Sequence, residues 1–171
     1  MRLFSGKIPV ISAEIARALK EAGDIETNDL AEVEEDVAAV LKEYLRTERE
    51  IVEKAKDLLE IRGLPYSQFS RLKKAVSDDR GFGVGDDALD YIMAQLIGCF
   101  MHSKFVEEVY AEDNELRRKM KPILRKHMSV DEEVDEEVRK RIKNLEEGTN
   151  SWEVEYRRVQ EQVMRKRRLT D

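Results

Sequence analysis

The sequence predicts an all-α protein, and its composition and its apolar spacing carry that prediction. Charged residues make up 40% of the 171 residues, aromatic residues make up only 6%, and glycine and proline number 8 and 3. Long solvated helices accommodate this composition better than the packed faces of a β-sandwich. Apolar residues also recur at helical spacing along most of the chain. We expect a single all-helical domain spanning residues 1–171.

A short helix is predicted after Pro9, because proline favours the first turn of a helix. Gly23 indicates its end, since glycine readily adopts the left-handed conformation found just past many helix C-termini. The apolar side of this helix consists of Ile11, Ile15, Ala18, Leu19 and Ala22.

A much longer helix is predicted from Asp29 to about Ile61. Asp29 and Glu32 match a capping box at its start, and no glycine or proline interrupts it before Gly63. Its apolar residues recur at near-heptad spacing: Val33, Val37, Val40, Tyr44, Ile51, Ala55 and Leu58. A helix of about 30 residues extends about 45 Å, more than a globule of this size needs, so one end is predicted to project.

A short return helix capped by Ser67 should follow, and we interpret the glycine-rich stretch 77–85 as a flexible connector. The next helix is predicted from Asp86 or Asp87 to about Tyr110. Its residues are apolar on nearly every side, which places it at the centre of the expected core.

Three further helical segments are expected in the rest of the chain. A helix from about Asp113 meets Pro122, which either kinks it or begins a new segment. Ser129 and Asn150 each precede a glutamate by three residues, as in a capping box, and are the predicted starts of the last two helices. Gly148 is the expected turn between them.

The second half of the chain repeats the apolar pattern of the first half. Leu41 aligns with Leu124, 83 residues further on. The same offset aligns Val33 with Leu116, Val37 with Met120, Ile51 with Val134 and Ala55 with Val138. Any two amphipathic helices can be brought into register, but here each copy continues into a glycine turn, aromatic residues and a basic helix. We predict an internal duplication with halves of about 1–80 and 81–171, related by a pseudo-twofold.

Two stretches resemble the bacterial family catalogued as domain of unknown function 507: residues 1–9, MRLFSGKIP, and residues 41–50, LKEYLRTERE. The resemblance covers essentially the whole chain. It implies an all-α, Y-shaped protein, with an antiparallel four-helix bundle as base and two projecting helical-hairpin arms. It implies no activity and transfers no catalytic residue.

No motif in the sequence indicates a catalytic, metal or cofactor site. The glycines of 81–85 precede a helix as in a phosphate-binding loop, but no strand precedes them and two aspartates follow. A carboxylate-bridged metal pair needs glutamate three residues before histidine, whereas Cys99 precedes His102 and Leu124 precedes His127 at that spacing. We therefore expect no cofactor.

Charge and cysteine usage indicate a soluble protein of a reducing cytoplasm. The net charge is −6, Cys99 is the single cysteine, and no apolar run approaches the about 20 residues that span a bilayer. The start of the sequence also lacks the pattern of a secretory leader.

Two groups of residues are candidate contacts for a ligand or partner. Tyr44 and His127 occupy matching positions on the two apolar stripes, where a histidine could contact a ligand or simply be packed. A basic patch near the C-terminus could bind an anionic partner or could only offset the helix dipole. It consists of Arg157, Arg158, Arg165, Arg167 and Arg168. Arg46 and Arg49 are interpreted as members of surface ion pairs with nearby glutamates.

Three functions stay open at this point. The leading hypothesis is a non-enzymatic binding or scaffold protein that holds another protein in the groove between two projecting arms. The second is weak RNA or DNA binding through the basic C-terminal helix. The third is a small-molecule site between the arms, enzymatic or not, that uses Tyr44 and His127. The oligomeric state is open, because exposed heptad faces can pair between chains.

Overall fold

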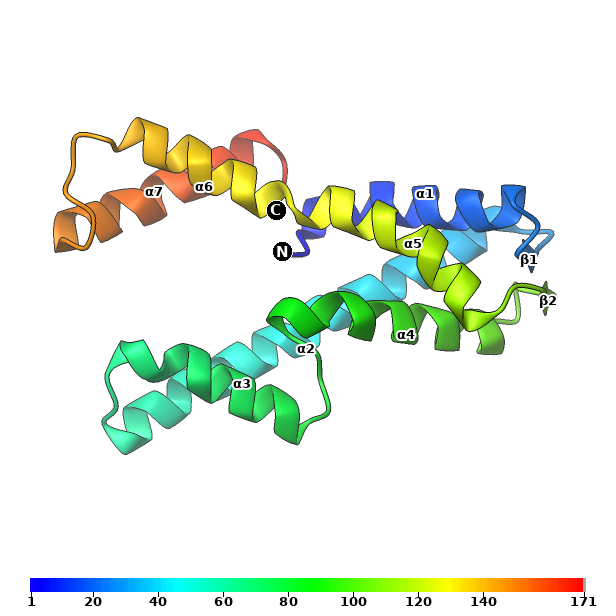
Figure 1. The fold of residues 1–171 in the computed structure, drawn as a ribbon, viewed down its shortest axis with the longest axis horizontal. Coiled ribbons are helices and arrows are strands. Elements are labelled where there is room, and N and C mark those ends of the chain that lie inside the picture. The colour runs from blue at the N-terminus through cyan, green and yellow to red at the C-terminus, as the bar shows by residue number, and fades with distance from the viewer. Residues whose placement is uncertain (171) are drawn as a thin grey trace.

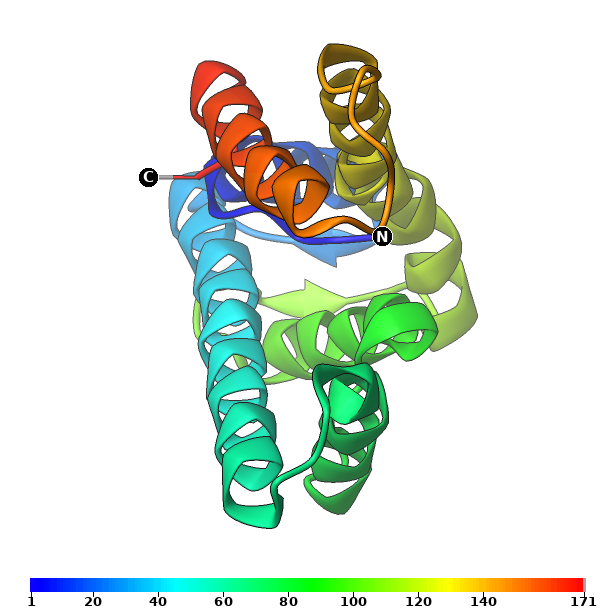
Figure 2. The same ribbon diagram turned by 90° about the vertical axis from the view of Figure 1, so that its left-hand side faces the viewer.

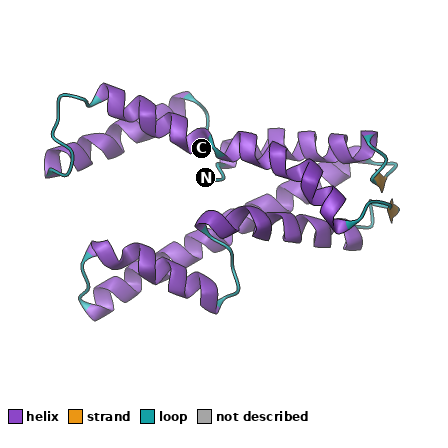
Figure 3. Ribbon diagram, in the orientation of Figure 1, coloured by secondary structure: helices purple, strands orange, loops and turns teal. Residues whose placement is uncertain are grey.

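The computed structural model describes residues 1–170 as seven α-helices joined by short connections (Figures 1 and 3). The helices are α1 (Ile8–Glu21), α2 (Leu30–Arg62), α3 (Phe69–Asp79), α4 (Ala88–His102), α5 (Asp113–Met128), α6 (Val130–Arg141) and α7 (Asn150–Lys166). Short 3-10 turns cover Ser5–Lys7, Tyr66–Gln68 and Gly85–Asp87, and the strands are β1 (Ile25–Glu26) and β2 (Glu108–Val109). The all-α prediction is confirmed. None of these helices is long and apolar enough to cross a membrane.

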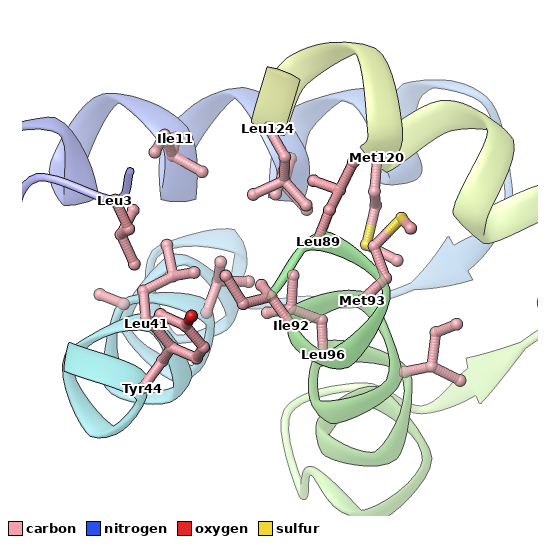
Figure 4. Packing of buried hydrophobic residues seen from close by; sticks show 14 of the residues in the cluster. Leu3, Ile11, Leu41, Tyr44, Leu89, Ile92, Met93, Leu96, Met120 and Leu124 are labelled. Carbon is pink, nitrogen blue, oxygen red and sulfur yellow. The ribbon is translucent and has the colours of Figure 1, made fainter. Parts of the chain in front are cut away.

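The largest hydrophobic cluster lies between α1, the N-terminal half of α2, α4 and α5. Figure 4 shows the side chains of these helices pointing toward one another. The main cluster includes Ile11, Ile15, Leu19, Leu41, Ile92, Leu96, Phe100, Leu116, Met120 and Leu124. Helix α4 alone contributes seven buried residues, because its apolar residues cover most of its circumference.

Two helical hairpins have small hydrophobic clusters of their own. The first hairpin, residues 55–79, packs α3 against the C-terminal part of α2 around Ala55, Leu59 and Leu72. The second hairpin, residues 130–166, packs α6 against α7, and its cluster includes Val134, Val138, Val159 and Val163. In Figure 1 the loops of both hairpins lie at the left end of the molecule, and Figure 2 views the molecule from that side.

The N-terminal segment joins the second hairpin to the main cluster. Leu3 belongs to the main cluster, whereas the next residue, Phe4, belongs to the cluster of the second hairpin. The amide of Gly6 donates to the carbonyl of Leu169 at 3.0 Å. A Cβ atom at Gly6 would lie 1.9 Å from the carbonyl oxygen of Arg168, so this close approach requires glycine.

A two-stranded antiparallel sheet connects the ends of α1 and α4. Ile25 pairs with Val109 and Glu26 pairs with Glu108. The hydroxyl of Tyr110 also donates to the carboxylate of Glu26 at 2.6 Å. In Figure 1 these strands lie at the end of the molecule opposite the hairpin loops. Strands of two residues are too short to produce an alternating pattern, so the sequence did not predict them.

Helix α4 ends at His102, so the predicted end near Tyr110 is wrong. Ser103 is extended, with ψ of 131°, and its hydroxyl donates to the carboxylate of Asp36. Val106 then packs into the main cluster from outside the helix. Tertiary contacts therefore override a local pattern that favours continued helix.

The glycine-rich stretch 77–85 packs against the core and is not the loose connector that we predicted. Phe82 and Val84 are both buried in the main cluster. Gly81 and Gly85 have φ angles of 61° and 60°, which let the chain turn so that both side chains face inward.

The predicted helix starts were correct only in part. Asp29 caps α2 as predicted, because its carboxylate accepts from the amide of Glu32 at 3.2 Å. Thr149, and not Asn150, caps α7. Ser129 makes no capping hydrogen bond to α6, and Ser67 lies within a 3-10 turn.

Pro122 lies inside α5 and does not begin a new segment. The helix is interrupted at Ser129, between α5 and α6, whereas α2 is continuous at the position that the 83-residue offset aligns with Ser129.

Candidate functional site

A cleft of about 430 Å³ lies between the N-terminal segment and the middle of α2, beside the start of the first hairpin. The N-terminal segment and the middle of α2 supply most of its lining, α3 contributes one residue, and the chain after α7 contributes another. We call it the inter-hairpin cleft. It is lined by Arg2, Leu3, Phe4, Ser5, Leu45, Glu48, Arg49, Val52, Lys73 and Thr170.

A second depression, of about 470 Å³, adjoins this cleft along α1 and α2. The two share Ser5, Leu45 and Arg49 as lining residues. The second depression, the α1–α2 groove, adds the residues Ile8, Pro9, Ser12, Glu34, Glu35, Ala38, Lys42 and Arg46. The cleft and the groove therefore form a continuous surface.

Both stretches that carry the family resemblance meet at this surface. Residues 1–9 supply Arg2 to Ser5 to the cleft, and they supply Ile8 and Pro9 to the groove. The block 41–50 supplies further residues to both. These are Lys42, Leu45, Arg46, Glu48 and Arg49. Segments 32 or more residues apart in the sequence thus line one site.

The inter-hairpin cleft offers positive charge beside apolar surface. Within residues 1–170, neither Arg2 nor Arg49 forms an ion pair, although the guanidinium of Arg2 lies 4.9 Å from the ring centroid of Phe4. Lys73 is already paired with Glu48 at 3.3 Å. Two exposed guanidinium groups are therefore available to carboxylates or other planar anions.

Arg46 and Arg49 behave differently, although we had expected both to form surface ion pairs. Arg46 lies 2.5 Å from Glu43, and that hydrogen bond raises the pKa of the Arg46 guanidinium. Arg49 has no such partner among the described residues. Arg49 lies in the cleft, and this position, not its helical spacing from nearby glutamates, distinguishes it from Arg46.

Tyr44 is a packed side chain outside the inter-hairpin cleft. Its hydroxyl donates to the carbonyl of Gly83 at 3.1 Å, and its ring stacks on Phe82 with centroids 4.8 Å apart. Burial, together with the nearby carboxylate of Glu48, raises the pKa of Tyr44. Tyr44 lines a separate cavity of about 320 Å³ between α2 and α4.

His127 is buried on α5, where it faces Glu14 of α1. Its Nε2 atom lies 3.1 Å from Oε1 of Glu14, and Nζ of Lys126 lies 3.4 Å from the same oxygen. Burial alone would raise the pKa of Glu14, but the contacts with His127 and Lys126 outweigh it and lower the pKa. His127 and Tyr44 line different cavities, so the structure does not bring these two candidate residues into one site.

The lowered pKa of Glu14 predicts a pH-dependent contribution to stability. Because the folded-state pKa lies below the unfolded one, the stabilisation is present above the ordinary carboxyl pKa and is lost as pH falls through the folded pKa. We expect wild type to exceed Glu14→Gln in thermal midpoint near pH 7, with the difference shrinking toward about pH 3. Glu35→Gln is the matched control, because it removes an exposed carboxylate that forms no ion pair with the other described residues. A difference between wild type and Glu14→Gln that is constant with pH would contradict this prediction.

The five candidate arginines near the C-terminus divide into two groups. Arg158 pairs with Glu155 at 2.8 Å, and Arg167 bridges to α6 through Glu133 and Glu137 at 2.8 and 2.9 Å. The other three are exposed and form no ion pair within residues 1–170. They are Arg157, Arg165 and Arg168.

The aromatic residues near this basic patch are engaged within the second hairpin. Trp152 and Tyr156 stack with ring centroids 5.0 Å apart, and the hydroxyl of Tyr156 donates to the carboxylate of Asp135. Burial and that hydrogen bond raise the pKa of Tyr156 to about 12. These rings therefore stabilise the contact between α6 and α7.

The fold and the cleft define an all-α protein with a continuous, partly cationic surface formed by the N-terminal segment, α1 and α2. The family model described as "Protein of unknown function (DUF507)" matches residues 1–169, so the chain belongs to this family. The resemblance carried by residues 1–9 and 41–50 is confirmed. A comparison with curated proteins found no match.

Proposed function

We propose that the protein is a non-enzymatic binding or scaffold protein that holds a segment of another protein in the inter-hairpin cleft. The observation that carries this proposal is the meeting of residues 1–9 and 41–50 at one surface, with two arginines that form no ion pair within residues 1–170. An acidic segment with apolar side chains fits that surface. Its carboxylates would bind Arg2 and Arg49, and its apolar groups would pack on Leu45 and Val52.

The proposed architecture for this function is a Y. Helices α1, the N-terminal half of α2, α4 and α5 would form an antiparallel four-helix base, and the first and second hairpins would be its two arms. The separate hydrophobic clusters of the two hairpins support this arrangement, as does the position of both hairpin loops at one end in Figure 1. Rigid helices on either side of the cleft would limit the entropy lost on binding.

An internal duplication would account for the two arms, and the strand pair supports it. Strands β1 and β2 are 83 residues apart, the same offset that aligns Leu41 with Leu124. A twofold axis between the strands would exchange the pair Ile25–Val109 with the pair Glu108–Glu26, and these are the observed partners. The helix N-caps Asp29 and Glu112 have the same offset.

Reversing the charge of the cleft tests the proposed function. Tagged wild-type protein purified from its native cells under mild salt should retain a partner, and the double variant Arg2→Glu, Arg49→Glu should retain at least about tenfold less of it. Arg118→Glu with Arg125→Glu is the matched control, because both residues are exposed on α5 and unpaired within the described chain. Equal recovery by the cleft variant and wild type would contradict the proposal, and so would equal loss in the control.

Weak nucleic-acid binding through α7 and the residues that follow it is the second candidate function, and three arginines without an ion pair within residues 1–170 favour it. They are Arg157, Arg165 and Arg168. Binding of this kind should depend steeply on salt and should be lost in the variant Arg165→Glu, Arg168→Glu. Absence of a gel shift by the wild-type protein at low salt would exclude it.

A further inference from the structure

The cavity between α2 and α4 is lined by a cluster of three aromatic rings. Its volume is about 320 Å³, and Tyr44, Phe82 and Tyr91 belong to its lining. The ring centroid of Phe82 lies 4.8 Å from that of Tyr44 and 4.6 Å from that of Tyr91. We call it the α2–α4 cavity. Its size and its aromatic wall are typical of sites for small molecules.

The aromatic rings and an acidic side chain lie at opposite ends of the α2–α4 cavity. At the aromatic end, the ring centroids of Tyr44 on α2 and Tyr91 on α4 are 6.1 Å apart. At the other end, Asp36 of α2 meets Cys99 of α4, whose Sγ lies 4.0 Å from the carbonyl oxygen of Asp36. Tyr44 follows Asp36 by eight residues, and Cys99 follows Tyr91 by eight. The two ends are therefore separated by about 12 Å along each helix.

The acidic end carries a negative charge that no basic side chain of the described residues neutralises. The carboxylate of Asp36 accepts a hydrogen bond from the hydroxyl of Ser103, but it forms no ion pair within residues 1–170. Glu43, the other acid of the lining, is paired with Arg46 at 2.5 Å. Burial and the charge of Asp36 raise the pKa of the Cys99 thiol. Asp36 is thus the carboxylate that can bind a cation in this cavity.

We propose that the α2–α4 cavity binds a small organic cation, with an ammonium group at one end and an aromatic or other apolar group at the other. The ammonium would bind the carboxylate of Asp36, and the apolar group would pack on the three rings. A hydrogen bond between two charged groups is stronger than one between neutral groups. The same carboxylate would repel an anion of equal shape, so the cavity selects by charge.

This inference does not rest on the proposed function. The α2–α4 cavity and the inter-hairpin cleft share no lining residue. The cavity also differs from the small-molecule site between the arms that the sequence suggested, because His127 lines another cavity.

Titration with three indole compounds, followed by amide chemical shifts, tests the preference for charge. Tryptamine carries an ammonium group, tryptophol a hydroxyl and indole-3-propionate a carboxylate. We expect tryptamine to bind with a Kd below about 1 mM at low salt and to shift residues 36–47 and 91–99, and we expect the other two to bind at least about tenfold more weakly. A Kd above about 1 mM for tryptamine, or equal binding of indole-3-propionate, would overturn the proposal.

Removing the carboxylate tests the role of Asp36. Asp36→Asn should weaken the binding of tryptamine at least about tenfold, because the amide keeps an acceptor for Ser103 but carries no charge. Glu35→Gln is the matched control, since it removes the neighbouring exposed carboxylate, which lies outside the cavity. It should bind tryptamine as wild type does. Equal affinities of Asp36→Asn and Glu35→Gln would contradict the assignment of the cation to Asp36.

Filling the cavity tests its location by a second route. Ala39 lines the α2–α4 cavity and is exposed on α2, so Ala39→Leu occupies part of the cavity without entering the core. It should weaken tryptamine binding at least about fivefold. Circular dichroism establishes that each variant is folded, and Ala39→Leu alone decides if Asp36→Asn is not. The cleft variant Arg2→Glu, Arg49→Glu should bind tryptamine normally, which separates a failure here from a failure of the proposed function. Unchanged affinity in Ala39→Leu would overturn the proposed site.

Discussion

Phe4→Ala is expected to detach the second hairpin while the main cluster stays folded. Phe4 is 2% exposed and packs with α6, α7 and Leu169, whereas Leu3 beside it packs into the main cluster. Replacing a buried phenylalanine by alanine costs about 3–5 kcal/mol. Because the cluster of the second hairpin is small, a loss of this size should exceed what holds the hairpin in place.

Hydrogen exchange resolved by segment measures this effect. In Phe4→Ala, the amides of α6 and α7 should exchange at least about a hundredfold faster, while those of α1 and α4 keep their protection. Leu3→Ala is the matched control, since it should instead weaken protection in the main cluster. An equal loss of protection over the whole chain in Phe4→Ala would contradict a separately packed second hairpin.

Phe100→Ala should destabilise the whole protein by about 3–5 kcal/mol, because its side chain is among the largest that are fully buried in the main cluster. Chemical denaturation followed by circular dichroism provides the free energy of unfolding. The matched control is Phe69→Ala, at the smaller cluster of the first hairpin, where Phe69 is only partly buried. Its effect should be local and at most about 1 kcal/mol. A cost below about 1 kcal/mol for Phe100→Ala would contradict the central role of α4.

The helices could be predicted because their signals are local. Val33, Val37 and Leu41 recur at helical spacing, and all three are buried in α2 as that spacing requires. The structure differs from the prediction where contacts between residues far apart in the sequence determine the local conformation. The hydroxyl of Ser103 bonds to Asp36 and ends α4 early, and Phe82 turns a glycine-rich connector inward by packing on Tyr44.

The lining of the inter-hairpin cleft could not be predicted from the sequence. The family resemblance implies a groove between two arms, which stays a prediction, and the sequence did not assign Arg2 or Arg49 to a cleft. Helical spacing offers glutamate partners to both Arg46 and Arg49, and only the fold shows that Arg46 alone is paired within the described residues. The one signal that could have found Arg49 is its place in the block 41–50, next to the other resembling stretch.

The sequence also could not separate Tyr44 from His127. Both lie on matching apolar stripes, yet their neighbours come from different elements. Tyr44 faces Phe82, and His127 faces Glu14, 113 residues away in the sequence. The local spacing of residues in the sequence gives no information about such long-range partners.

The most direct test of the proposed function is site-specific photo-cross-linking in native cells. A benzophenone amino acid replaces Val52 on the cleft wall, and a second protein carries it at Arg118 on the exposed face of α5. The proposal predicts one reproducible cross-linked protein from position 52, absent from position 118 and lost when Arg49→Glu is added. Cross-links from position 52 that match those from position 118, or that persist with Arg49→Glu, would contradict it.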